Sequence, residues 1–323
     1  MLYSMDLIGF ELALLRSSDA YSKIRDKTGN RIIRNIVKPF IFLFYMCMSI
    51  PVFLRLRITV PAVSLFITSR CSLRCKDCSN MIPSYETPSD TTLDELKTYT
   101  LNVLEGVDAL YRASIVGGEP FLFDDLGKLV DFLTSQKKIR SVKIFTNGTL
   151  LPKAEWLSPF KNKKAFVFVS NYEHSSKFNE CIKILNENGV KTYAADKEQK
   201  WIDMGGIYDR GYTYSQAKKL FRSCPMRVCK LLAKGSLYVC GRSTAADSLG
   251  FIPCSNSDKT VEKVDLTKSD PPRIRREIRK LFKVKTLTAC NYCNGGSNYI
   301  LPATQCSKKD AREPFGNQKE IPN

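Results

Sequence analysis

Residues 60–78 of the chain read VPAVSLFITSRCSLRCKDC, and this stretch indicates the fold. Its first part, Ala62–Thr68, is uncharged and apolar over the length of a buried strand. Three cysteines follow directly, Cys71, Cys75 and Cys78, in a C-x₃-C-x₂-C spacing. Three thiolates on one short loop can bind three irons of a cubane cluster and leave the fourth iron open to a substrate or cofactor. A zinc site with a fourth ligand from elsewhere is the alternative.

Short apolar runs and helical periodicity alternate between residues 60 and 196, which is typical of a parallel α/β sheet or barrel. Further strands are predicted at 113–116, 142–145, 165–170 and 190–194. Helices are predicted at 92–104, 124–134, 178–188 and 214–221, the first of them capped by Ser89 or Asp90. Because the carboxyl ends of parallel strands lie at one edge, the segments that follow these strands should meet there.

The second predicted strand continues into the sequence Gly117-Gly118-Glu119-Pro120. Two glycines allow a ligand to approach the backbone closely, and a carboxylate beside them suits an ammonium group. A Gly-Gly-Glu sequence found alone would be interpreted as a simple turn between a strand and a helix. Next to a cysteine loop at the same sheet edge, it indicates a ligand-binding site.

In the order of these motifs, the sequence resembles the radical S-adenosylmethionine (radical SAM) superfamily over about residues 60–196. The cysteine loop follows the first strand, Gly-Gly-Glu-Pro the second, and Phe145-Thr146-Asn147-Gly148 the third. The resemblance implies the α/β class, with a partial (β/α)6 barrel as the core. It also implies a [4Fe-4S] cluster and SAM as cofactors. The implied reaction is reductive cleavage of SAM to a 5′-deoxyadenosyl radical, which removes hydrogen from a C–H bond.

The same resemblance implies roles for individual residues. The three cysteines of the loop would be the cluster ligands. The residues implied to contact SAM are Gly117, Gly118, Glu119, Thr146, Asn147 and Ser170. Among them, Glu119 and the two glycine backbones would hold the methionyl amine, and Ser170 would contact the ribose or the carboxylate. Many family members have an aromatic residue just before the third cysteine, near the adenine, where this chain has Asp77.

A second group of cysteines lies in the last hundred residues. Cys224 and Cys240 form a C-x₁₀-G-x₄-C pattern, and Cys290 and Cys293 form a C-x₂-C pair. The alternation between residues 230 and 240 predicts a hairpin that turns near the glycine. The pattern resembles the twitch module, which is related to the SPASM domain, and implies that these four cysteines bind a second [4Fe-4S] cluster. The alternatives are a zinc ribbon and the set Cys290, Cys293 and Cys306, which is similar to the auxiliary site of the GTP cyclase of molybdenum-cofactor biosynthesis.

The other cysteines and the single histidine are less informative. Cys47 and Cys181 are predicted to be small buried side chains. Cys229 and Cys254 have no assigned role and stay alternates for the second cluster. The chain has 12 Cys and one His, so a three-histidine zinc site or a two-histidine iron site cannot form within it. That histidine, His174, is predicted to be a solvated loop residue.

The implied function is that of an oxidoreductase or epimerase acting on a C–H bond of a sugar, polyol or peptide. An electron donor such as flavodoxin or ferredoxin would be a partner. With 50 Lys+Arg against 32 Asp+Glu, the net charge is +18, which suits an anionic substrate or an anionic membrane surface. Residues 273–280 have basic helical spacing without an RNA-recognition motif, so RNA is not the favoured partner. A radical SAM enzyme that modifies RNA and a non-catalytic electron-transfer or partner protein are the alternatives.

The N-terminal region has an apolar run at residues 39–54 between basic residues. Pro39 is expected to begin a helix and Pro51 to end it, too short to span a bilayer. The helix would either be buried at the end of the barrel or lie on an anionic membrane surface. No secretory signal pattern is present, so the chain is predicted to be cytoplasmic, either free or peripheral to the inner face of the membrane.

Four segments are predicted from these features. They are an N-terminal helical extension at 1–59, a radical SAM core at 60–212, a small α+β auxiliary-cluster domain of the twitch type at 213–308, and a polar tail at 309–323.

Overall fold

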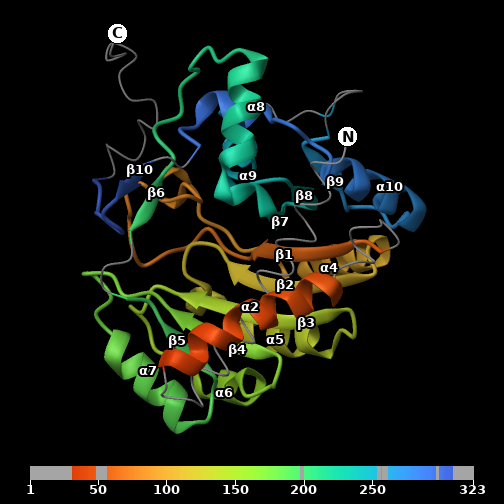
Figure 1. Ribbon diagram of the computed structural model, residues 1–323. Coiled ribbons are helices and arrows are strands. Elements are labelled where there is room, and N and C mark those ends of the chain that lie inside the picture. Colours follow the sequence, from red (N-terminus) through yellow and green to blue (C-terminus); the bar gives the residue numbers. More distant parts are fainter. Residues whose placement is uncertain are drawn as a thin grey trace.

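The computed structural model describes residues 31–48, 57–196, 200–252, 256, 261–295 and 298–307. Its main sheet is drawn in Figure 1. Five parallel strands lie in chain order: β1 (Thr59–Phe66), β2 (Ala109–Val116), β3 (Ile139–Thr146), β4 (Ala165–Val169) and β5 (Thr192–Ala194). On the other side of β1 lies a sixth parallel strand, β7 (Cys229–Ala233), followed by antiparallel β8 (Ser236–Tyr238) and β9 (Lys263–Asp265). The sheet stays open among the described residues, and the predicted α/β partial barrel is confirmed.

One face of the sheet is covered by helices and forms the core. The covering helices are α4 (Leu93–Gly106), α5 (Leu126–Ser135), α6 (Ala154–Phe160) and α7 (Phe178–Glu187). On β3, Val142 and Ile144 are fully buried toward this layer, whereas Lys143 and Phe145 alternate with them and are half-buried. Burying one such aliphatic side chain contributes about 1.5–3 kcal/mol. The alternation leaves the opposite face of the sheet for a cavity.

The capping of α4 differs from the prediction. Thr92 is the N-cap: its hydroxyl accepts the Glu95 N–H, and the Glu95 carboxylate accepts the Thr92 N–H. This reciprocal capping box satisfies two N–H groups at the helix start. Ser89 and Asp90, which we expected as caps, instead hold the end of β1, where Asp90 accepts two hydrogen bonds from the Arg70 guanidinium.

The region after residue 200 combines short helices and strands. Its helices are α8 (Tyr214–Ser223), α9 (Gly241–Ser248) and α10 (Pro271–Leu281), and β6 (Trp201–Asp203) pairs with β10 (Asn298–Ile300) in a separate antiparallel ribbon. The predicted hairpin is confirmed as β7 and β8, with Gly235 at φ +71° in its turn. Since β7 pairs directly with β1, segments before and after residue 212 share one sheet. The predicted domain limits stay predictions, and the tail at 309–323 lies outside the described residues.

The N-terminal helix α2 (Arg31–Met48) begins earlier than expected. Pro39 lies inside the helix rather than at its start, and Pro51, which was expected to end it, lies outside the described residues. The expectation of a buried helix is wrong for its described side chains, because Phe40 is 69% exposed and Phe44 is 58% exposed. Cys47 is also exposed, against the prediction. No helix within the described ranges is long and apolar enough to cross a membrane.

Candidate functional site

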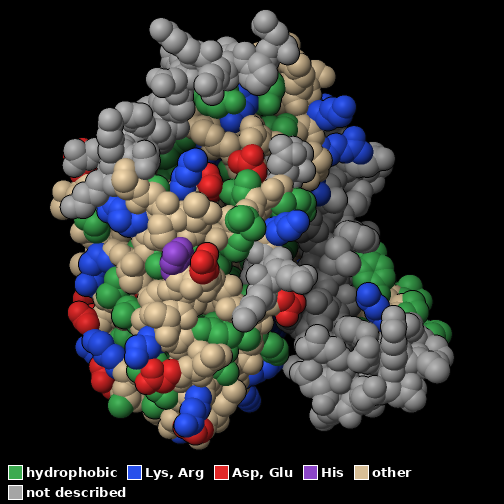
Figure 2. All heavy atoms as spheres, turned by 90° about the vertical axis from the view of Figure 1, so that its left-hand side faces the viewer, with side chains coloured by type: hydrophobic (Ala, Val, Ile, Leu, Met, Phe, Trp, Pro, Cys, Tyr) green, Lys and Arg blue, Asp and Glu red, His purple; other side chains and the backbone are tan. Residues whose placement is uncertain are grey.

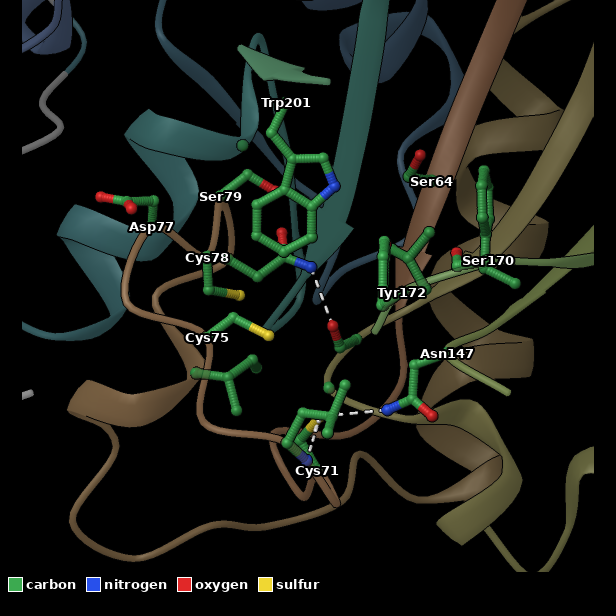
Figure 3. A pocket seen from close by; sticks show the side chains of 18 of the residues that line it. Ser64, Cys71, Cys75, Asp77, Cys78, Ser79, Asn147, Ser170, Tyr172 and Trp201 are labelled. Carbon is green, nitrogen blue, oxygen red and sulfur yellow. Dashed lines mark hydrogen bonds between the residues drawn. The ribbon is translucent and has the colours of Figure 1, made fainter. Parts of the chain in front are cut away.

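A cavity of about 480 Å³ opens at the carboxyl ends of strands β1 to β4 (Figure 3). The predicted site residues that line it are Cys71, Cys75, Cys78, Gly117, Gly118, Thr146, Asn147 and Ser170. Each comes from the segment that follows a strand, so the parallel sheet brings residues about a hundred positions apart in the sequence to one edge. The structure therefore brings together every predicted residue of the first site except the side chain of Glu119.

The three cysteines of the loop have free thiols that receive hydrogen bonds from amides. The Leu73 N–H donates to Cys71 Sγ over 3.5 Å, and a side-chain amide reaches Cys75 Sγ. Cys78 Sγ accepts hydrogen bonds from backbone N–H groups of the three-residue segment 80–82. Amide donors of this kind stabilise a thiolate that binds metal. The sulfurs and their donors thus fit a cluster with one open iron.

Burial raises the pKa of Cys71 to about 11 and that of Cys75 to about 12, and it also raises the pKa of Cys78. The metal-free thiols are therefore protonated at neutral pH, and binding of iron has to release their protons. No three His, Cys, Asp or Glu side chains of the described segments are grouped around a single ion position. A cubane does not need such a group, because each of its irons takes its own thiolate.

Gly117 and Gly118 are required by the packing of two backbones. A Cβ on Gly117 would lie 2.4 Å from the Thr68 carbonyl oxygen, and one on Gly118 would lie 2.1 Å from the Arg70 carbonyl oxygen. The Gly118 N–H donates to Thr68 O over 2.8 Å. We expected the glycines to make room for a ligand. Contact with the start of the cysteine loop already demands them.

Glu119 has its carboxylate turned into the protein rather than toward the cavity. It is fully buried, and its two oxygens accept the Phe121 N–H at 2.9 Å and the Asn147 N–H at 2.7 Å. Burial raises its pKa to about 7, and these N–H donors partly oppose the shift. The carboxylate therefore ties the segment after β2 to the segment after β3.

Asn147 links the third strand to the cysteine loop. Its side-chain amide donates to Ser72 Oγ at 3.0 Å and to Cys71 Sγ at 3.7 Å, the second of which is drawn in Figure 3. Its oxygen accepts the Thr149 N–H at 3.0 Å, which fixes which end of the amide faces the sulfur. Ser170 lines the same cavity, and its N–H donates to Thr146 O.

Two aromatic residues of the site were missed in the sequence. Tyr172 and Trp201 line the cavity, and their rings meet edge to face with centroids 5.3 Å apart (Figure 3). Trp201 lies on β6, a three-residue strand without recognisable periodicity, so no sequence signal marked it. Asp77, at the position where an aromatic residue was expected, lines the same cavity, and burial raises its pKa.

The second cysteine group meets at a separate place. Cys224, Cys240, Cys290 and Cys293 line one small cavity between α8, α9 and the 3₁₀ turn η4 (Thr288–Tyr292). The Ser243 N–H donates to Cys240 Sγ at 3.4 Å, and the Gly295 N–H donates to Cys293 Sγ at 3.3 Å. Burial raises the pKa of Cys290 to about 11 and raises those of Cys224 and Cys240. These features parallel those of the first loop.

The remaining candidates lie elsewhere. Cys306 lies beside the first loop, where its N–H donates to Arg74 O at 2.8 Å, and not in the second cavity. Cys181 is buried as predicted. His174 is exposed, and Figure 2 shows it on a face where basic and acidic side chains are mixed. Cys254 and the side chain of Cys229 lie outside the described residues.

An open, largely parallel sheet with a cysteine-lined cavity at its carboxyl edge defines an α/β partial barrel with a candidate metal-cluster site. Residues 65–194 match the family model of the Radical SAM superfamily. Such a match implies a [4Fe-4S] cluster and SAM as cofactors, and the three thiols beside an open cavity fit the cluster.

Among curated proteins, the GTP 3′,8-cyclase of Aliarcobacter butzleri (strain RM4018) is 32% identical over 90 residues, 27% of this chain and 27% of that protein. The GTP 3′,8-cyclase of Clostridium acetobutylicum is 31% identical over 88 residues, again 27% of each. This chain thus matches 27% of the length of these relatives. Among solved structures, BtrN in complex with AdoMet and 2-DOIA has 16% identity and a TM-score of 0.49, covering 73% of this chain and 93% of that one.

Proposed function

We propose that this chain is a radical SAM enzyme of the oxidoreductase or epimerase type. It would cleave S-adenosylmethionine reductively and remove a hydrogen atom from a C–H bond of a sugar, polyol or peptide. The observation that carries the proposal is that three thiols, which accept hydrogen bonds from amide N–H groups, line one cavity together with the Gly117-Gly118 backbone and Ser170. When bound, the cluster and SAM supply the reductive cleavage and the 5′-deoxyadenosyl radical.

The protein residues then bind, orient and exclude water. Thr146, Asn147 and Ser170 offer polar contacts at the rim of the cavity. Glu119 acts on SAM indirectly, because its hydrogen bond fixes the position of Asn147 relative to the glycine segment. Below the rim, Val116 and Phe145 form apolar walls. Such a lining keeps water from a reactive radical.

Tyr172 and Trp201 are proposed to pack against the adenine of SAM. They supply the aromatic surface that Asp77 does not, and an aromatic contact contributes about 0.5–1.5 kcal/mol beyond its buried area. Loss of one ring should therefore weaken SAM binding about tenfold. Equilibrium dialysis of SAM with Trp201→Ala, compared with Tyr214→Ala at an exposed position on α8, would test this.

A second [4Fe-4S] cluster is proposed on Cys224, Cys240, Cys290 and Cys293. Their common cavity and the N–H donors to two of their sulfurs support this ligand set. The similarity to GTP 3′,8-cyclases suggests a nucleotide as an alternative substrate, with Cys306 as the third member of a three-cysteine site. The position of Cys306 beside Arg74 does not favour that alternative.

The partners and location are proposed from charge and exposure. An electron donor such as flavodoxin or ferredoxin would reduce the cluster. On α2, the exposed side chains Phe40, Leu43, Phe44 and Met48 follow helical spacing along one side, and the chain carries a net charge of +18. This helix is therefore proposed to lie on an anionic membrane surface. The unaltered protein should float with anionic vesicles at low salt, and Leu43→Asp should abolish this flotation. If the unaltered protein does not float, the proposed membrane contact of α2 is contradicted.

The enzymatic proposal is tested by anaerobic reconstitution followed by iron analysis and incubation with SAM and dithionite. Two clusters give about eight irons per chain, and SAM cleavage gives 5′-deoxyadenosine. The matched control is Cys47→Ser, because Cys47 is exposed on α2 and away from both cavities. A reconstituted protein that never forms 5′-deoxyadenosine contradicts the radical SAM activity. About four irons with 5′-deoxyadenosine formed contradicts only the second cluster.

A further inference from the structure

A short C-terminal segment lies directly on the cysteine loop of the first site. Residues 304–306 run antiparallel to residues 74–76, with Gln305 opposite Cys75. The Lys76 N–H donates to Thr304 O at 2.7 Å, and the Cys306 N–H donates to Arg74 O at 2.8 Å. We name residues 303–306 the C-terminal strap. Through it, a segment about 230 residues away in the chain holds the central cysteine of the cluster loop.

The side chain of Gln305 adds a second connection to the same place. Its Oε1 accepts the Arg74 N–H at 2.7 Å, and its Nε2 donates to Cys75 Sγ at 3.6 Å and to Ala303 O at 2.5 Å. The Arg74 N–H needs an acceptor and Ala303 O needs a donor, so the two ends of the amide cannot be exchanged. An N–H group of Gln305 therefore faces the sulfur.

The backbone of the strap is shaped to present this amide. Ala303 is buried and has φ +58°, in the left-handed region that residues with a Cβ seldom adopt. The turn at Ala303 returns the chain toward the loop, and the Gln305 amide closes the turn by donating to Ala303 O.

We propose that Gln305 is a positioning residue that sets the reduction potential of the cluster bound through Cys75. This rests on the proposed function, because it requires a cluster on the first cysteine loop. Reduction adds negative charge to a cluster, and an N–H donor to a ligand sulfur stabilises that charge, so the donor raises the potential. The strap thereby makes the cluster easier to reduce before SAM is cleaved.

The test is a redox titration followed by electron paramagnetic resonance, on the full reconstituted chain. The signal that changes when SAM is added identifies the first cluster and separates it from any other. Gln305→Leu replaces the amide by an uncharged apolar side chain without the donor, and it should shift the midpoint potential of that signal to a lower value. Gln305→Glu places negative charge near the sulfur and should lower the potential further. Thr304→Ala is the control on the same strap, because Thr304 contacts the loop through its backbone oxygen.

The outcomes separate this proposal from the proposed function. A potential that is unchanged or higher in Gln305→Leu, at unchanged iron content, overturns the role of Gln305 and leaves the radical SAM activity standing. A loss of iron that is equal in Gln305→Leu and Gln305→Glu, with the remaining cluster at the original potential, shows a purely structural strap and also overturns it. If the unaltered protein has no signal that responds to SAM, the proposed function itself fails.

Discussion

The two cysteine groups share their local chemistry and differ in what surrounds them. In both, thiols are free and buried enough to have raised pKa values, and backbone N–H groups point at sulfur, as from Leu73 to Cys71 and from Gly295 to Cys293. The first group has three cysteines beside a cavity of about 480 Å³. The second has four around a space of about 30 Å³. We call the first group, Cys71, Cys75 and Cys78, the open site, because the space beside it leaves room for a ligand. We call the second group, Cys224, Cys240, Cys290 and Cys293, the closed site, because the space among its sulfurs does not.

The two regions also differ in the buried charged group next to them. The first has the Glu119 carboxyl, which binds two backbone N–H groups. The second has the Arg242 guanidinium, which is 5% exposed and donates to the carbonyl oxygens of Gly205, Gly206 and Tyr292. Burial lowers the pKa of Arg242, but an arginine keeps its proton. Only the Glu119 pKa lies near neutrality, so the comparison predicts a pH response at the first site.

The largest effect is expected from removing a ligand of the open site. Cys78→Ala should reduce the iron content from about eight to about four per chain and bring 5′-deoxyadenosine formation to the background of the assay. The physical reason is that two thiolates cannot retain a cubane whose remaining irons have no protein ligand. Iron analysis and chromatography of the nucleoside products measure both quantities. Retained SAM cleavage would show that the open site does not lie on this loop.

The corresponding change in the closed site should separate iron content from SAM cleavage. Cys240→Ala should also leave about four irons, but the SAM-responsive signal of the first cluster should persist. Cys306→Ser is the informative control, since Cys306 lies beside Arg74 and should leave about eight irons. A loss of about four irons in Cys306→Ser, with none in Cys240→Ala, would favour the three-cysteine alternative.

The sequence predicted the parallel core because its strands are short apolar runs bounded by turn residues. β1 to β5 all lie where runs were recognised, with ends that shift by up to four residues. The strand β6 and its partner β10 were not recognised, because each has three residues and depends on a partner about a hundred positions away. The pairing of β7 with β1 was missed for the same reason. Contacts of long sequence separation leave little trace in local periodicity.

The site was predictable where chemistry is carried by spacing, as for the cysteines and the glycine pair. It was not predictable where a side chain turns away from the position its motif suggests. The Glu119 carboxylate points into the protein because two N–H groups, from Phe121 and Asn147, need an acceptor there. The strap residue Gln305 could not be anticipated, since nothing in its own sequence marks a contact with Cys75.

Replacing a glycine by alanine should lower the free energy of unfolding much more in the open site than at an uncrowded position elsewhere. Gly118→Ala places a methyl group 2.1 Å from the Arg70 carbonyl oxygen, and overpacking of this kind costs about 3 kcal/mol or more. Gly250→Ala is the matched control, because its Cβ would meet nothing within 4 Å although φ is +73°. Its cost should be only the strain of about 1–2 kcal/mol. Denaturant unfolding of both variants measures the difference, and equal losses would contradict backbone contact as the reason for Gly118.

The smallest expected effect concerns the pH response of the first site. The pKa of Glu119 is raised to about 7 in the folded protein, so the folded state binds more protons than the unfolded state between about pH 4.5 and 7. The free energy of unfolding should therefore fall as pH rises through that window, by at most about 3 kcal/mol from this group. Below pH 4.5 the cost of the buried charge is absent, and above pH 7 it is fully present.

Glu119→Gln isolates this contribution. The glutamine carries no charge, so the free energy of unfolding of the variant should not show this decrease between pH 5 and pH 8. The variant is still expected to be less stable than the unaltered protein. One end of the glutamine amide is a donor, and it would face the backbone N–H of Phe121 or Asn147, which then has no acceptor. Unfolding at pH 5, 6, 7 and 8 should show the stability advantage of glutamate over glutamine shrinking as pH rises. A constant difference across that range would mean that Glu119 is ionised throughout, and the contrast with the permanently charged Arg242 of the second site would no longer hold.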